Sequence, residues 1–254
     1  MAVAKKVKKD VVRVEPTKEG ESRKSDWKPT PEAKSKATTY RIIALLLWAL
    51  AIAGEVFLIF KVLKETPVNM VLLIGGIIVI GILAVIGNLL WKQSNRLDPA
   101  YRSDTVRFFI QNQLGAIISI IAFLPIIVLI LMNKDMDTKQ KGIATAVGAV
   151  VLVLATLSGV TLNSPSVEQY TAETDYVMSI TGQNLVYWTK AGNVYHLCAG
   201  ASDLPREAKD MTIYSGTVAD AHAAGKERLT LKVDEEIKQC GLTAPAVASP
   251  TPKP

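Results

Sequence analysis

The sequence predicts an all-α transmembrane four-helix bundle, built from two helical hairpins and followed by a small C-terminal α+β domain. The bundle is predicted by four apolar runs, at residues 40–63, 68–91, 108–132 and 142–162. A helix rises about 1.5 Å per residue and the hydrocarbon core of a bilayer is about 30 Å thick, so each run is long enough to cross it. The domain is predicted by residues 185–242, where short segments of alternating apolar and polar residues flank turn residues.

The composition is that of a chain with an apolar middle and two polar ends. Mean hydropathy is +0.25 and 49% of the 254 residues are hydrophobic. About forty polar residues precede the first run, which is too long for the apolar region of a signal peptide and has no small-residue cleavage site after it. We therefore expect this run to remain in the mature protein as a membrane span.

Basic residues are distributed unevenly about the four runs. The N-terminal tail and the loop 92–107 together hold 16 Lys and Arg, whereas the two loops on the other side hold five. Since positively charged loops tend to stay in the cytoplasm, we predict a multi-pass protein of the cell membrane with both termini cytoplasmic. The cysteines of the C-terminal region, Cys198 and Cys240, are then expected to be thiols and not a disulfide.

Residues 1–39 form a basic tail that is predicted to be disordered. They mix Lys, Glu, Ser and Pro without apolar periodicity, and such a segment cannot bury enough surface to offset the entropy of ordering. The tail is either a topology determinant or a segment attracted to anionic lipids, at about 1 kcal/mol per nearby basic residue. Because the positive charge lies in the tail and the membrane flanks, nucleic acid is not an expected partner.

Short connections predict which runs are neighbours. Residues 64–67 and 133–140 can only join antiparallel helices, while the loop between the hairpins contains Asp98-Pro99, a turn signal. Ala144 and Gly148 form a small-xxx-small pair that favours close packing of the fourth run. Pro125 is expected to kink the third run.

Three segments follow the fourth run. Residues 163–184 are interpreted as a linker with a short helix. Residues 185–242 are the predicted domain, whose expected core consists of Val186, Trp188, Val194, Leu197, Ile213 and Val218. Residues 243–254 are rich in Pro, Ala, Ser and Thr, and are predicted to be unstructured.

Local signals place the elements of this domain. A β-hairpin is predicted around Ala191-Gly192-Asn193, which has the glycine that a tight turn favours. A strand is predicted at residues 212–214. Thr217 and Asp220 form a capping box that should start a short helix, which Gly225 should close.

The intramembrane polar candidates are Glu55, Gln111 and Asn112. Glu55 is the only carboxylate within a run, and an ionisable residue inside a span is by default a functional candidate. The alternative is a carboxyl group that is hydrogen-bonded across the bundle or reaches toward the outer surface. Interhelical amide hydrogen bonds are a sufficient explanation for Gln111, Asn112 and the nearby Asn88. Since polar residues do not continue across the bilayer, a conducting pore is not favoured.

Residues 185–241 resemble a small module found in many bacterial membrane proteins. The resemblance rests on VYWTKAGNVYHL, then DMTIYSGTVADAHAAGK, then a terminal Cys. The layout of the module is similar to the zinc-binding region of the Ada DNA-repair protein, with a Tyr-His pair, a Cys, a Gly-Thr-Val helix start and a closing Cys-x-x-Cys. The four runs, with NRLDPAYRSDTVRFFIQNQLGA and SVEQYTAET, resemble the membrane part of the same uncharacterised family, which is common among actinobacteria.

The resemblance implies a zinc site, which this chain matches only in part. Tyr195 and His196 match the Tyr-His pair. Ala201, however, stands where the first Cys is expected, and residues 229–232, where the closing Cys-x-x-Cys would lie, contain no Cys. The ligand pool for a four-coordinate site would be His196, Cys198, His222 and Cys240. On a strand, the first two of these would point to the same face and compete for space. We therefore expect a degenerate module without zinc or another cofactor, in which His222 is an ordinary surface or rim histidine.

No phosphate-binding loop, nucleophile elbow or metalloprotease motif occurs in the sequence, so an enzyme is not expected. The sequence favours a non-catalytic polytopic membrane protein that acts as an accessory subunit or as a docking or scaffold component of a larger membrane complex. Its partners would be other membrane-protein subunits, and by analogy alone the actinobacterial respiratory supercomplex is one candidate. The alternatives are a small transporter or channel that uses Glu55, and a metal-responsive membrane sensor.

Overall fold

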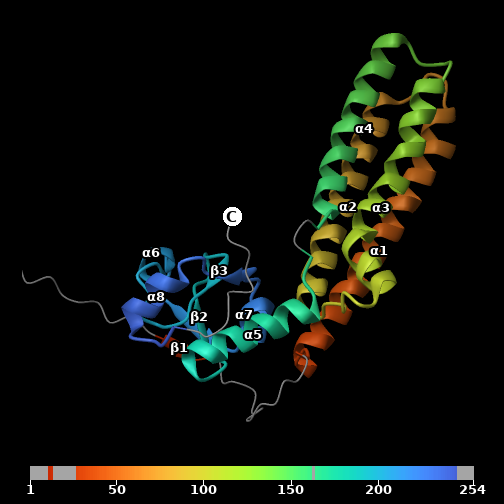
Figure 1. Ribbon diagram of the computed structural model, residues 1–254. Coiled ribbons are helices and arrows are strands. Elements are labelled where there is room, and N and C mark those ends of the chain that lie inside the picture. Colours follow the sequence, from red (N-terminus) through yellow and green to blue (C-terminus); the bar gives the residue numbers. More distant parts are fainter. Residues whose placement is uncertain (1–10, 14–26, 162–163, 245–254) are drawn as a thin grey trace, which may run out of the picture. The chain divides into compact units, whose positions relative to one another are not determined.

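The computed structural model describes residues 11–13, 27–161 and 164–244 (Figure 1). The chain divides into two compact units. The helical unit comprises Lys34–Ser164, and the C-terminal unit joins Pro165–Pro254 with Met1–Ala33. Four long apolar helices and a small region containing strands confirm the predicted fold class at this level.

Four helices build the helical unit, and each is long and apolar enough to cross a membrane. They are α1 Pro31–Phe60, α2 Met70–Leu97, α3 Thr105–Met132 and α4 Thr138–Gly159. A short 3₁₀ turn, η1 Val62–Lys64, follows α1. The helices therefore include most of each predicted run, and α2 and α3 continue into the predicted loop at 92–107.

The first helix begins inside the tail that was predicted to be disordered. Thr30 Oγ1 accepts a hydrogen bond from the N–H of Ala33 at 3.1 Å, and Pro31 occupies the first helical position, where its missing N–H costs nothing. The prediction of disorder is therefore wrong for residues 31–39. It is also wrong for the short strand β1 Val11–Arg13, whereas residues 1–10 and 14–26 lie outside the described part of the chain.

All four helices contribute to one apolar core. Its buried side chains include Leu58, Ile77, Phe123 and Ala155, one from each helix. A Cβ atom added to Gly159 would overlap the backbone of α3 at residues 115 and 116, so the two helices approach closely there. The predicted small-residue pair also packs inward, since Ala144 and Gly148 are both buried.

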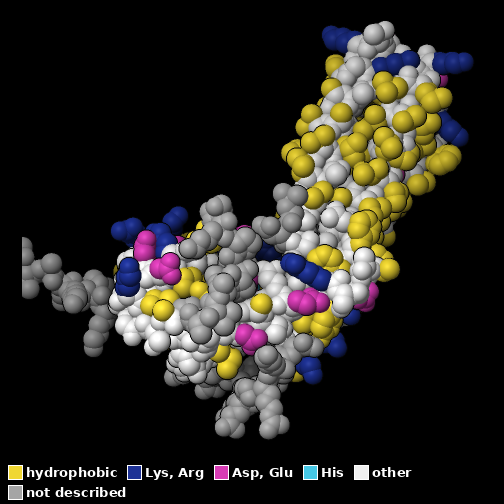
Figure 2. All heavy atoms as spheres, in the orientation of Figure 1, with side chains coloured by type: hydrophobic (Ala, Val, Ile, Leu, Met, Phe, Trp, Pro, Cys, Tyr) yellow, Lys and Arg dark blue, Asp and Glu magenta, His cyan; other side chains and the backbone are white. Residues whose placement is uncertain are grey.

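The outer surface of the helical unit is also apolar. Figure 2 shows hydrophobic side chains along the long helices, with Lys and Arg at the end of this unit. Val71 is 85% exposed, Met132 68% and Leu157 65%. Such an extensive apolar surface is compatible with a membrane protein, because water would not favour it.

The C-terminal unit mixes short helices and strands. Its helices are α5 Val167–Thr181, α6 Leu204–Glu207, α7 Val218–Ala223 and α8 Val233–Cys240. Its strands, apart from β1, are β2 Val186–Trp188, β3 Val194–Tyr195, β4 Ile213–Gly216 and β5 Arg228–Leu229. In one sheet β4 lies between β1, to which it is parallel, and β2, to which it is antiparallel; β3 and β5 form a separate parallel pair.

The local signals of this unit are confirmed. Tyr187 and His196 exchange both backbone hydrogen bonds, at 2.8 and 2.7 Å, and so close the predicted hairpin. Thr217 and Asp220 form the predicted capping box of α7. Gly225, with φ of 85°, ends that segment as expected. Of the expected core, Val194 alone is half-buried, and the other members are buried.

The unit begins earlier than the sequence indicated. Residues 167–181, within the predicted linker, form α5, which buries Tyr176, Val177 and Ile180 in the same core as Val186 and Trp188. A helix of fifteen residues with one buried face is a structural element of the domain and not a connection.

Cys198 and Cys240 form a disulfide, so the prediction that they are thiols is wrong. That prediction followed from the cytoplasmic location inferred for the C-terminal region, not from any feature of the two residues. The disulfide joins the segment after β3 to the last residue of α8.

Candidate functional site

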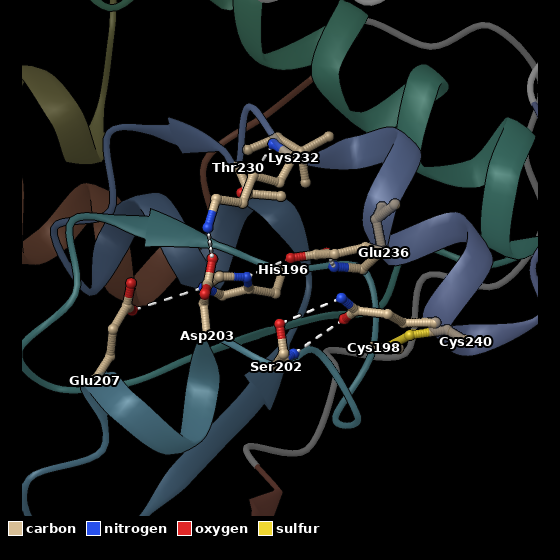
Figure 3. Close-up of polar contacts among 12 residues, drawn as sticks. His196, Cys198, Ser202, Asp203, Glu207, Thr230, Lys232, Glu236 and Cys240 are labelled. Carbon is tan, nitrogen blue, oxygen red and sulfur yellow. Dashed lines mark hydrogen bonds and ion pairs between the residues drawn. A yellow bond between two sulfur atoms is a disulfide. The ribbon is translucent and has the colours of Figure 1, made fainter.

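The candidate site is a buried histidine, His196, between two carboxyl groups (Figure 3). Its side chain is fully buried, and Nδ1 lies 2.5 Å from Oε1 of Glu236. The other oxygen of Glu236 accepts the backbone N–H of Leu197 at 2.9 Å. On the opposite side, His196 Nε2 lies 3.6 Å from Oε2 of Glu207 and has no hydrogen-bond partner among the described residues.

Helix α8 is fixed against the segment 196–203 at both ends. Near its start, Lys232 Nζ lies 2.9 Å from Asp203 Oδ2. Near its end, Gln239 exchanges hydrogen bonds with Ser202, and the disulfide follows one residue later. These ties hold the carboxyl group of Glu236 against the imidazole, because Glu236 lies on the helix between them.

A pocket of about 470 Å³ opens beside Glu207. Its lining consists of Ala191, Gly192, Asn193, Val194, Arg206, Glu207 and Lys209. Lys226 is buried, and its amine donates hydrogen bonds to the carbonyl groups of Lys190 and Gly192 in the 190–192 loop. A side chain at position 192 would overlap the carboxyl group of Glu207, so the glycine leaves room for that group beside the pocket.

The charges of this site favour an imidazolium. Burial lowers the pKa of His196, but the hydrogen bond and the negative charge of Glu236, reinforced by Glu207, outweigh it and raise that pKa from its ordinary value. Burial lowers the pKa of Lys226. The arrangement is an ion pair inside the unit, with the second carboxyl group positioned between the ring and the pocket.

A second histidine, His222, is also buried and not on the surface, so that prediction is wrong. Its Nε2 lies 2.7 Å from Glu173 Oε2 and its Nδ1 lies 2.9 Å from the carbonyl oxygen of Lys226. The ring is stacked on Tyr170 at 3.6 Å between centroids. Glu173 also accepts from Tyr195 Oη at 2.6 Å. Both ring nitrogens lie within hydrogen-bond distance of an oxygen atom, so the ring is held from both sides.

The electrostatics of the second cluster follow from these contacts. Burial opposes ionisation of Glu173, yet the hydrogen bonds and charge of His222, with the hydrogen bonds from Tyr195 and Gln169, lower its pKa from the ordinary value. Burial and the neighbouring carboxylate raise the pKa of Tyr195 well above its ordinary range. All of these groups are partnered within the unit, so the cluster is structural.

The structure does not bring the four candidate metal ligands together as a free set. Cys198 and Cys240 are bonded to each other, and both nitrogens of His222 are engaged elsewhere. Among the described residues, no group of three or more His, Cys, Asp or Glu side chains could hold a metal ion.

Several polar residues of the helical unit form an interhelical network centred on Asn88. Trp48 Nε1 donates to Asn88 Oδ1 at 3.1 Å, and Asn88 Nδ2 donates to the carbonyl oxygen of Ala155 at 2.8 Å. Ser119 Oγ and Ser158 Oγ accept from the same amide, each at 3.0 Å. The prediction of interhelical amide hydrogen bonds is confirmed for Asn88.

Gln111 and Asn112 are buried near the start of α3 but are used differently. The backbone oxygen of Gln111 accepts from Trp91 Nε1 at 2.8 Å. The side chain of Asn112 donates to Phe108, within its own helix, at 2.8 Å, so its predicted interhelical bond is not formed among the described residues. Glu55 is 4% exposed on α1, and one of its carboxyl oxygens has no hydrogen-bond partner in the described part of the chain.

The comparisons with models of protein families, with curated proteins and with solved structures find no match for this chain. The site therefore has to be interpreted from its own geometry. Sequence reasoning missed both of its carboxyl groups, Glu207 and Glu236, and also Glu173 of the second cluster. One signal was available, because Val233, Glu236, Ile237 and Cys240 have the spacing of one helix face.

The stability of the C-terminal unit is expected to fall on both sides of neutral pH. The folded-state pKa of His196 is raised, so its contribution is complete below the unfolded value of about 6.5 and is lost as pH rises through the folded value. The folded-state pKa of Glu173 is lowered, so its contribution is complete above an unfolded value of about 4.3 and is lost as pH falls through the folded value. Thermal unfolding of the full chain in detergent, monitored by proteolysis of residues 165–244 at a series of pH values, measures the loss of stability at acidic and at alkaline pH. In His196→Gln the loss of stability at alkaline pH should be smaller, while the loss at acidic pH should stay the same. An unchanged loss at alkaline pH would contradict the assignment to His196.

Proposed function

We propose that this protein is a non-catalytic, multi-pass membrane protein whose C-terminal unit is a docking module of a larger membrane complex. The observation that supports this best is the internal pairing of the reactive groups in that unit. His222 and Glu173 bind each other, the two cysteines form a disulfide, and His196 is paired with Glu236. No hydroxyl or thiol lies within hydrogen-bond reach of His196 Nε2 among the described residues, so a nucleophile activated by this base is not supported.

The four long helices support a place in the membrane. Their outward side chains are apolar, and their shared core contains one polar network whose central amide, Asn88, is fully partnered. An inward polar network with an apolar exterior is the arrangement that a lipid surrounding favours. In this proposal the four helices form a transmembrane bundle, and the C-terminal unit is the part that other subunits recognise.

The surface around the pocket supports docking. Arg206 has a side chain that is 79% exposed, and it lines the pocket together with Lys209 and Glu207. Charged, exposed side chains around a polar pocket give specificity for a protein surface with complementary charge. Other membrane-protein subunits are the partners that we propose.

The docking role is tested by purifying the tagged full chain in mild detergent beside the variant Arg206→Glu/Lys209→Glu. Both positions lie at the pocket rim, so the variant should fold as the parent does. We expect partner subunits to copurify in fixed stoichiometry with the parent and to be lost from the variant. A parent chain that purifies alone, or a set of subunits that the charge reversal leaves unchanged, would overturn the proposal.

Both termini are cytoplasmic in this proposal, because 16 basic residues lie on their side and five on the other. The disulfide favours the opposite side, since disulfides persist mainly in oxidising compartments. A cytoplasmic disulfide would belong to the redox-responsive class. The charge difference involves three connections and the tail, whereas the disulfide is a single local feature, so we give the charge more weight.

Reporter fusions should decide the orientation. A fusion after Pro254 is expected to give a cytoplasmic signal, and a matched fusion in the loop before α4, after Lys134, is expected to give an external one. The reverse pattern would place the C-terminal unit outside the cytoplasm, where its disulfide is the ordinary state of two neighbouring cysteines.

A further inference from the structure

Glu55 lies on the inward stripe of α1. From residue 44 on, the buried side chains of this helix recur at the spacing of one helix face, namely Ala44, Trp48, Ala51, Glu55 and Leu58. Leu58 and Ala51, the buried neighbours on either side, belong to the apolar core of the helical unit. The carboxyl group therefore occupies a position at which the pattern predicts an apolar side chain.

No opposite charge is available to it inside the bundle. Residues 42–60, 70–91, 108–132 and 142–161 contain no Lys, Arg or His, and Glu55 is their only acidic residue. The nearest charge along its own helix is Lys61, six residues on, which is about 9 Å along the axis. Within these ranges, α2, α3 and α4 thus present no titratable group to Glu55.

The hydrogen bonding of Glu55 is incomplete as well. The side chain is 4% exposed, and one carboxyl oxygen has no partner among the described residues. Its carboxyl group lies against α3, where it is hydrogen-bonded to the backbone of Ile126, next to Pro125.

We propose that Glu55 is a proton-binding site inside the bundle, which holds a proton at neutral pH and exchanges it with the membrane side on which Lys61 lies. An unpaired carboxylate in a low-dielectric interior is strongly disfavoured, and the bound proton removes that charge. Lys61 marks the nearer end of the helix, so exchange from that side crosses the shorter distance. The site requires that the helical unit lies in a membrane, but it is independent of the docking role of the C-terminal unit.

A hydrophobic carbodiimide, dicyclohexylcarbodiimide, tests for the proton. A protonated carboxyl group adds across the reagent, with its oxygen bonding to the central carbon and its proton moving to a nitrogen. The acyl group then shifts from oxygen to the other, unprotonated nitrogen and gives a stable N-acylurea, with no atom lost and no oxidant required. Peptide mass spectrometry of the full chain labelled in native membranes locates the product.

Glu65 is the matched internal control. It lies after α1 and is exposed to solvent, so a water-soluble carbodiimide should label it and the hydrophobic reagent should not. We expect label at Glu55, loss of that label in Glu55→Gln, and its retention in Glu65→Gln. If Glu55→Gln does not fold, Glu55→Asp keeps the carboxyl group and should still be labelled.

Labelling as a function of pH tests exchange. Over a range of increasing pH the label at Glu55 should decline as the proton is lost, because only the protonated group reacts. A protein that remains intact but is never labelled at Glu55 would overturn the proposal, and so would labelling of Glu55 by the water-soluble reagent to the extent seen at Glu65. Labelling that is constant over the range would overturn the exchange, because it would show a proton that never leaves.

Discussion

Replacing Glu173 by alanine is expected to unfold the C-terminal unit. Its carboxylate accepts hydrogen bonds from His222 at 2.7 Å, Tyr195 at 2.6 Å and Gln169 at 2.9 Å, and the side chain is 2% exposed. Removing one partner of a buried ion pair leaves an uncompensated charge, which costs about 3–5 kcal/mol. That is comparable to the whole stability of a small domain.

The measurement is the thermal unfolding of residues 165–244 within the full chain, detected by limited proteolysis in detergent. Glu235→Ala is the matched control, because Glu235 is exposed on α8. The control should unfold as the parent does, whereas the alanine variant at 173 should be digested at temperatures where the helical unit stays intact. An alanine variant that is as resistant as the control would show that the buried cluster is not what holds the unit together.

The helical unit could be predicted from the sequence because its signals are local. Apolar runs of sufficient length define the helices, and short connections define their order. The start of α1 was missed since residues 31–39 are polar, and their helix is set by a cap at Thr30 and by Pro31 and not by apolar periodicity. In the C-terminal unit, the hairpin and the capping box were predicted for the same reason, because each lies within a few residues.

The histidine clusters could not be predicted, because their members are far apart in sequence. His222 and Glu173 are separated by 49 residues, and His196 and Glu236 by 40. In the sequence, a carboxyl group on a polar helix such as α8 cannot be distinguished from a solvent-exposed one, because only tertiary packing buries it. The location of His222 was misjudged for the same reason, since its short helix is half-buried on one face and packed against α5 on the other.

The disulfide distinguishes the two interpretations of the cysteines and histidines in this unit. In the metal-sensor alternative, His196, Cys198, His222 and Cys240 would need a zinc ion to hold the fold, as small metal-dependent domains do. In the structure, the cysteines bind each other across a sequence separation of 42 residues, and each histidine is paired with a carboxyl group. The two interpretations predict opposite responses to a reductant and a chelator.

Reduction of the disulfide is expected to destabilise the C-terminal unit strongly, while a chelator leaves it unchanged. Closing a loop with a separation of 42 residues restricts the unfolded chain by about 4 kcal/mol in the chain-entropy model. Both cysteines are half-buried, so a thiol reductant can reach them. Thermal unfolding of residues 165–244 in the full chain should therefore shift to lower temperature with reductant and should not shift with chelator.

The double variant Cys198→Ser/Cys240→Ser is the matched control for this experiment. It should unfold at the temperature of the reduced parent and should not respond further to reductant. The core of Val186, Trp188 and Leu229 and the ion pairs of His196 and His222 remain in the variant, so the unit should still fold at low temperature. If a chelator instead lowers the unfolding temperature of the parent, and zinc copurifies with it and is absent from the double variant, the cysteines are metal ligands, and the sensor interpretation replaces the docking one.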